Sequence, residues 1–197
     1  KNLEDAPAFY PGCGKDAWHG RHATTQSTWK QLIRMLLSAQ GKPDSPAAIL
    51  EYQRNRLGAA DGETCLLELF PLPSPNLATW KYADWSELPW LQSRQAYEQK
   101  VLGQRISLLR QRVNHHRPRV VVFYADGQLT HWQRIMGPGN YLRPIADKLI
   151  AHERDGLQFF VTKHPTTPEL QGYADDYFQE IGCYFFNNCR LRFFPRE

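Results

Sequence analysis

Closely spaced cysteines are missing from this sequence. The 197-residue chain has four, Cys13, Cys65, Cys183 and Cys189, and no two of them form a C-x-x-C pair. Zinc and iron–sulfur sites are usually built from such pairs, so the spacing argues against both. We expect reduced, partly buried thiols, with no metal and no other cofactor.

Long apolar runs are also missing. No apolar stretch approaches the roughly 20 residues that are needed to span a bilayer, and the first residues lack the basic-then-apolar pattern of a signal sequence. We therefore expect no membrane association and a cytoplasmic location. A Gly-x-Ser-x-Gly elbow is absent as well, which disfavours a small-molecule hydrolase of the α/β type.

The residues that are present indicate a globular protein with a bulky core. Hydrophobic residues make up 42% of the chain and aromatics 13%, and a mass of 22.9 kDa suits one sizeable domain rather than two. We expect a single domain over residues 1–197. The sequence does not indicate an oligomeric state, and a monomer is the simplest expectation.

Positive charge is clustered although the net charge is only +4. Basic residues crowd one segment and the C-terminus: Arg105, Arg110, Arg112, His115, His116, Arg117 and Arg119, then Arg190, Arg192 and Arg196. Such clusters suit a phosphate backbone, and they also suit a solvated helix face. Charge alone favours the second interpretation.

Apolar periodicity predicts alternating helices and strands. Helices are expected at 29–40, 46–57, 94–114, 143–154 and 173–181, and strands at 7–10, 64–70, 119–127 and 157–162. This order predicts an α/β fold with three layers, α/β/α, around a central, mostly parallel four-stranded sheet. The loops after the first, second and last strands would then converge at one edge of the sheet and form a site.

The sequences of these loops resemble the motifs of the uracil-DNA glycosylase superfamily. "HPTTPEL" (164–170) is similar to the family's strand-terminal His-Pro-Ser motif, and "AFYPGCGKDAWHGRHATTQSTW" (8–29) is similar to its first motif. "CLLELFPLPSPN" (65–76) lies where the family has a base-reading strand, and "VVVFYADG" (120–127) matches its plain third strand. The order of elements agrees over roughly the whole chain.

The resemblance implies a DNA glycosylase. Such an enzyme flips a nucleotide out of duplex DNA and hydrolyses the N-glycosidic bond to leave an abasic site. Since no lysine stands out for Schiff-base chemistry, we expect a monofunctional enzyme that uses water. His164 would hydrogen-bond the departing base, and an ordinary histidine in a surface turn is the alternative.

The first motif departs from the family pattern. Tyr10, Pro11 and Gly12 stand where the family often has a carboxylate or amide before proline, so the usual water-positioning group is missing. Asp16 is the nearest replacement, and a turn or cap aspartate is the alternative. The missing group also motivates a rival interpretation, in which the chain is a non-catalytic module that binds or senses modified DNA.

Two residues indicate which base would be bound. An ionised Glu68 can only accept hydrogen bonds, which suits the amino group of a cytosine-like base, although a salt-bridged glutamate is equally plausible. Gly12 stands where uracil-specific relatives have a tyrosine, which leaves carbon 5 of the pyrimidine uncovered. Together they favour a 5-modified cytosine, and a role in defence against phage DNA is compatible with it. A plain uracil-DNA glycosylase is the alternative.

The remaining candidate residues would contact the flipped base or the DNA backbone. A base could stack on Trp18, His22 or Phe70, and Leu170 could wedge into the duplex, but all four could equally belong to the core. Contacts to the DNA are expected from Lys163, Pro165, Thr166 and Ser74. Hydroxyl groups in proline turns more often stabilise the turn itself.

Overall fold

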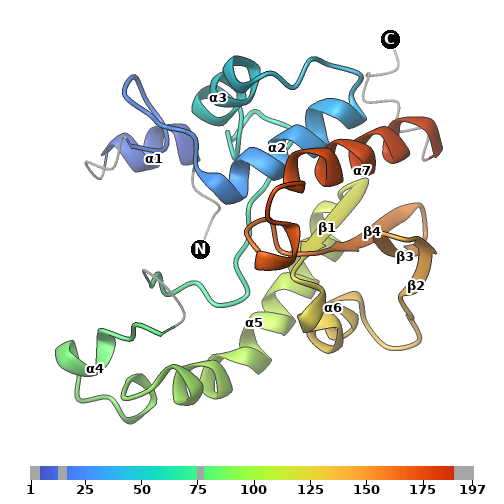
Figure 1. The fold of residues 1–197 in the computed structure, drawn as a ribbon. Helices are drawn as coiled ribbons and strands as arrows, with labels where there is room; N and C mark the ends of the chain where they lie inside the picture. Colours follow the sequence, from blue (N-terminus) through green and yellow to red (C-terminus); the bar gives the residue numbers. More distant parts are fainter. Residues whose placement is uncertain (1–4, 13–16, 75–77, 189–197) are drawn as a thin grey trace.

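The computed structural model describes residues 5–12, 17–74 and 78–188 and has a single-domain mixed α/β fold (Figure 1). The helices are α1 Ala6–Gly12, α2 Ser27–Ala39, α3 Pro46–Asn55, α4 Tyr82–Trp85, α5 Arg94–His116, α6 Leu129–Met136 and α7 Ala174–Asn188. The strands are β1 Val120–Tyr124, β2 Arg143–Ala146, β3 Leu149–Arg154 and β4 Leu157–Thr162. Short 3-10 turns, η1 Pro89–Leu91, η2 Asp126–Gln128 and η3 Pro168–Leu170, complete the fold.

The sheet is mixed, so the expectation of a mostly parallel sheet was wrong. Its strand order is β1-β4-β3-β2, in which β1 and β4 are parallel and the other two pairings are antiparallel. The expected helix at 143–154 is instead the two strands β2 and β3. A two-residue Asp155-Gly156 turn with φ of 53° and 75° closes the β3–β4 hairpin, and this dipeptide is a strong hairpin signal.

Two further strand predictions were wrong. Residues 7–10 lie in helix α1, because a stretch this short carries too little periodicity to separate helix from strand. Residues 64–70 join no ladder, and Glu68 contacts the last residue of β1 through its side chain. The Arg105 side chain donates to the backbone carbonyls of Glu68 and Leu69, groups that a ladder partner would otherwise use.

The other predicted elements are confirmed to within a few residues, apart from α7, which runs about two turns beyond its predicted end. Ser45 and Ser93 cap α3 and α5, since each side-chain oxygen accepts from the backbone N–H three residues later. The cap of α2 is Gln26, whose side chain accepts from Trp29 N at 2.6 Å. Helix α6 was not predicted.

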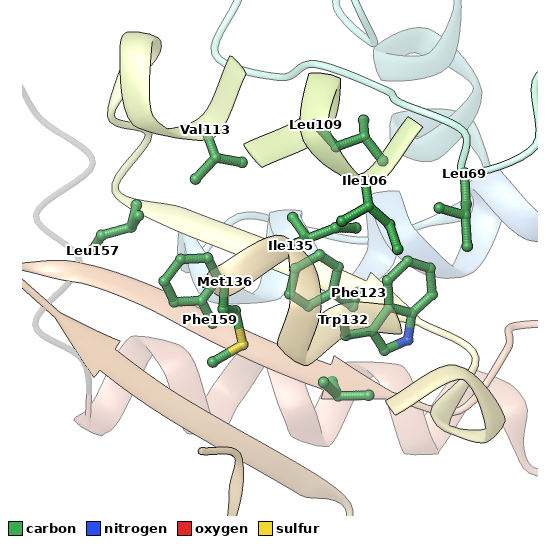
Figure 2. Close-up of a cluster of buried hydrophobic side chains, with 11 residues drawn as sticks. Leu69, Ile106, Leu109, Val113, Phe123, Trp132, Ile135, Met136, Leu157 and Phe159 are labelled. Atoms are coloured by element: carbon green, nitrogen blue, oxygen red, sulfur yellow. The ribbon is translucent and has the colours of Figure 1, made fainter. Parts of the chain in front are cut away.

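Strand β4 is buried on both faces. Phe159 and Val161 pack into a cluster with residues of α5 and α6, including Ile106 and Trp132 (Figure 2). Phe160, between them in sequence, packs into a second cluster with residues of α2 and α7. The alternation of side chains along a strand therefore directs β4 into two separate cores. Figure 1 shows α2 and α7 side by side on the second of them.

A charged network joins α2 to the first turn of α7. The Asp175 carboxylate contacts Lys30 Nζ at 2.9 Å, Gln31 Nε2 at 2.7 Å and Arg34 Nη1 at 2.8 Å. Arg34 is buried and also pairs with Asp44 at 3.2 Å. Burial alone would raise the pKa of Asp175, but these hydrogen bonds and charges outweigh it and hold the pKa below its ordinary value.

Acid is therefore expected to weaken the fold through Asp175. Because the folded-state pKa is depressed, the stabilisation is complete above the unfolded-state pKa of about 4 and is lost as the pH falls through the lower folded-state value. Asp175→Asn should lower the urea midpoint near neutral pH and flatten its decline in acid. Urea unfolding at a series of pH values measures both. Asp176→Asn, an exposed neighbour in the same turn, is the control, and equal acid sensitivity in the wild type and Asp175→Asn would contradict the assignment.

Candidate functional site

The candidate site lies where β1 and β4 end. These strands are parallel and Tyr124 is in register with Thr162, so the segments that follow β1 and β4 leave the sheet at the same edge. Ala125, directly after β1, has a φ of 90°, which is rare for a residue with a Cβ. Its N–H donates to Thr162 O at 3.1 Å, and its carbonyl accepts from Trp132 Nε1 at 2.9 Å. The surrounding structure thus holds a strained turn at this edge.

His164 follows β4 and has a defined tautomer. Its Nδ1 accepts the backbone N–H of Thr166 at 3.2 Å, and the Thr166 hydroxyl lies 3.1 Å from the same nitrogen. Since a backbone amide can only donate, Nδ1 carries no proton and the neutral ring carries its proton on Nε2. Burial lowers the pKa of His164, although the nearby Glu68 opposes that shift. The imidazole is therefore an uncharged Nε2–H donor at neutral pH.

Glu68 lies close to His164, as the sequence predicted, and a third residue joins them. The Tyr124 hydroxyl donates to Glu68 Oε1 at 3.1 Å, and its ring lies 5.6 Å from the imidazole of His164. Burial, followed by the charge of Glu68, raises the pKa of Tyr124, so the phenol stays protonated. Sequence reasoning missed Tyr124. Its place as the last residue of an apolar strand, at the carboxyl end, was the available signal.

Tyr10 stands within the electrostatic reach of Glu68. Burial raises the pKa of Tyr10, and the Glu68 charge adds to the shift. The Tyr10 ring stacks on His19 with centroids 5.2 Å apart and meets Trp18 edge-on at 5.6 Å. Trp18 is 40% exposed, so it retains surface on which a ligand could stack. The first motif thus contributes to the site from the end of a helix, not from a strand.

His19 is a second residue that sequence reasoning missed. It is fully buried beside Tyr10 and Trp29, and burial is the main cause that lowers its pKa. Backbone carbonyls of Arg54 and Gln53 oppose that shift. His19 is therefore an uncharged, buried member of the aromatic cluster that Tyr10 and Trp29 form with it. His22, which the sequence favoured over it, lies exposed in a turn.

Several predicted residues have structural roles. Leu170 is 1% exposed inside the α2–α7 core, so its assignment as a DNA wedge was wrong. Phe70 packs against Tyr97 and the cluster of Figure 2. Ser74 stabilises its own loop, since its hydroxyl donates to Thr79 O and accepts from Arg94. Pro165 is buried.

Two further predictions are altered or lie beyond the described residues. Lys163 pairs with Glu169, so a phosphate would have to compete with that carboxylate. Asp16 lies outside the described residues, as do Cys13, Cys189 and the three C-terminal arginines. The two described cysteines, Cys65 and Cys183, are free thiols at the surface and not the partly buried thiols that we expected.

The basic segment of α5 is partly occupied by structural contacts. Arg110 donates to the carbonyl of Arg134 at the C-terminal end of α6, where cations are favoured by the helix dipole. Arg117 donates to Asp155 O at 3.1 Å. These contacts favour the structural interpretation of the cluster over a phosphate-binding one.

Within residues 5–12, 17–74 and 78–188, no group of three or more His, Cys, Asp or Glu side chains is arranged to hold a metal ion. No helix in that part of the chain is long and apolar enough to cross a bilayer. Comparison of the chain with protein-family models, with curated proteins and with solved structures found no match.

Proposed function

We propose that this protein is a monofunctional DNA glycosylase that flips out a modified pyrimidine and hydrolyses its N-glycosidic bond. The observation that carries the proposal is the state of His164. A neutral imidazole at a strand end, with its proton fixed on Nε2, is suited to donate to a carbonyl oxygen of a base. The charge of Glu68 influences both His164 and Tyr10, which supports a shared site for one ligand.

The chemistry follows from charge development. When the bond to the base breaks, negative charge grows on the base and positive charge on the sugar. An N–H donor aimed at the base oxygen stabilises the first charge, and in a site of low water content one such donor contributes about 3 kcal/mol. A water molecule then completes the hydrolysis and leaves an abasic site. The partner is DNA from which the nucleotide has been extruded.

The proposed base is a cytosine with a substituent at carbon 5. The Glu68 carboxylate accepts hydrogen bonds only, so it suits an amino group at position 4. A Cβ placed on Gly12 would meet no atom within 4 Å, which is compatible with an uncovered carbon 5. Since enlarged cytosines distinguish foreign DNA from a host's own, a defence role against phage DNA belongs to the same proposal.

The proposal includes the three-layer arrangement of the superfamily. The two clusters on opposite faces of β4 support it, since each contains helical residues. The antiparallel β2 and β3 depart from the parallel sheet that the resemblance implies. Fold analogy alone does not determine function, so the site carries the argument.

Incubating the protein with duplex and single-stranded oligonucleotides tests the proposal. The substrates contain uracil, hypoxanthine, cytosine or 5-hydroxymethylcytosine, and alkali cleavage reports abasic sites. We expect cleavage with 5-hydroxymethylcytosine and none with cytosine. Cleavage of uracil alone would support the plain uracil enzyme. Binding that weakens steeply with salt, with no abasic product from any substrate, would replace the proposal with the sensing module.

A further inference from the structure

Tyr124 connects the two groups to which the proposed function assigns the base. Its hydroxyl is bonded to Glu68 and its ring faces His164, so one side chain contacts both. Tyr124 belongs to β1, which pairs with β4. This pairing fixes the backbone of Tyr124 relative to β4, the strand that His164 follows. Glu68 has no such support, because residues 64–70 take no part in the ladder.

Arg105 and Tyr124 both hold Glu68, but they hold different parts of the residue. Arg105, from α5, donates to the carbonyls of Glu68 and Leu69 and therefore fixes the backbone. Tyr124 donates to the carboxylate itself. The charged and titratable groups near this carboxylate are Arg105 from α5, Tyr124 from β1, His164 after β4 and Tyr10 from α1.

The direction of the Tyr124–Glu68 hydrogen bond is unambiguous. A carboxylate cannot donate, so the phenol proton lies between Tyr124 and Oε1. The raised pKa of Tyr124 keeps that proton in place over the whole physiological range. The bond occupies Oε1 and restricts rotation of the carboxylate, which leaves Oε2 to accept a hydrogen bond from a ligand.

We propose that Tyr124 is a positioning residue that orients Glu68 as the acceptor for the amino group of the base, so that the substrate class is amino-bearing rather than keto pyrimidines. This inference rests on the proposed glycosylase function. A keto base would place its oxygen against the oriented carboxylate oxygen, and two acceptors cannot form a hydrogen bond. Discrimination would then depend on the carboxylate remaining ionised and in place.

A matched pair of substrates isolates this effect. 5-Hydroxymethylcytosine and 5-hydroxymethyluracil share the substituent at carbon 5 and differ at position 4, where one has an amino group and the other an oxygen. The ratio of kcat/KM for the two bases is measured for the wild type and for Tyr124→Phe. We expect the wild type to favour the amino base and the variant to lower the ratio about tenfold or more.

Tyr52→Phe is the matched control. Tyr52 is buried and donates to Glu63 Oε1 at 2.9 Å, the same type of bond in a part of the chain remote from β1 in sequence. Its removal should reduce stability without changing the substrate ratio. A ratio that changes equally in both variants would overturn the positioning role.

The outcomes separate the inference from the function on which it rests. Absence of base release by the wild type removes the proposed function. Release by the wild type, with an unchanged ratio in a folded Tyr124→Phe, overturns the inference alone. If Tyr124→Phe does not fold, Glu68→Gln tests the acceptor role of Glu68 on which the positioning depends, because an amide can donate to a keto base. That variant should lose the preference for the amino base, and a retained preference would overturn the inference.

Discussion

Replacing His164 with alanine is expected to slow base release at least about 100-fold, because the departing base loses its only proposed N–H donor. Nδ1 is held by the Thr166 amide, so no other atom of this residue could supply the proton. Single-turnover cleavage of a 5-hydroxymethylcytosine oligonucleotide measures the rate. Binding of the same oligonucleotide, measured by fluorescence anisotropy, should change little, since the lost interaction strengthens only as charge develops.

His116→Ala is the control for this variant. His116 is exposed at the end of α5, near the start of β1, so its removal should leave the rate unchanged. Equal rates for the wild type and His164→Ala would remove His164 from the chemistry. Such a result would also favour the sensing module, provided that the wild-type rate itself does not exceed the background.

Gly182→Ala is expected to destabilise the fold by about 3 kcal/mol, the upper part of the range for overpacked cores. A Cβ at this position would lie 2.4 Å from Met35 O and 2.5 Å from Ser38 Cβ, both in α2. Backbone cannot move aside as a flexible side chain can, so α2 and α7 would have to separate. The favourable helix propensity of alanine, about 1 kcal/mol, is too small to offset this cost. Urea unfolding measures the difference.

Gly103→Ala, which also lies in a helix, is expected to stabilise the fold rather than destabilise it. Gly103 lies inside α5, and a Cβ there would meet no atom within 4 Å. This variant should raise the free energy of unfolding by about 1 kcal/mol, because only the helix propensity changes. If both Gly182→Ala and Gly103→Ala stabilised the protein, α2 and α7 could not approach each other as closely as the structure shows.

The helices were the most predictable part of the fold. Helices α3 and α5 were predicted to within a few residues, and the structure shows that Ser45 and Ser93 cap them, a local chemistry that a sequence can reveal. The sheet was less predictable. Residues 143–154 were interpreted as a helix, and only Asp155-Gly156, which was overlooked, indicated the hairpin that these residues form. Residues 64–70 have the composition of a strand, yet the Arg105 guanidinium takes two of their carbonyls, and no local pattern reveals such a long-range partner.

The candidate site was predictable where the loop sequences resemble the superfamily motifs. His164 and Glu68 were identified from that resemblance, and the structure brings them together through Tyr124. Leu170 was misassigned as a wedge since exposure is a tertiary property, and the same leucine fits a core or a surface equally well in sequence. Tyr124 was missed because an aromatic at the end of a β-branched run looks like one more strand residue. Its hydroxyl matters only once Glu68 lies opposite.

The attachment of residues 64–70 has an evolutionary consequence. In the part of the chain that is described, this segment is tied to its surroundings by side chains and not by a ladder. A mutation there need not disturb strand register, and the residue at position 68 can change with little effect on the sheet. Under the proposed function, descendants of this protein could therefore acquire new base preferences through few substitutions, while the framework that carries His164 is inherited unaltered.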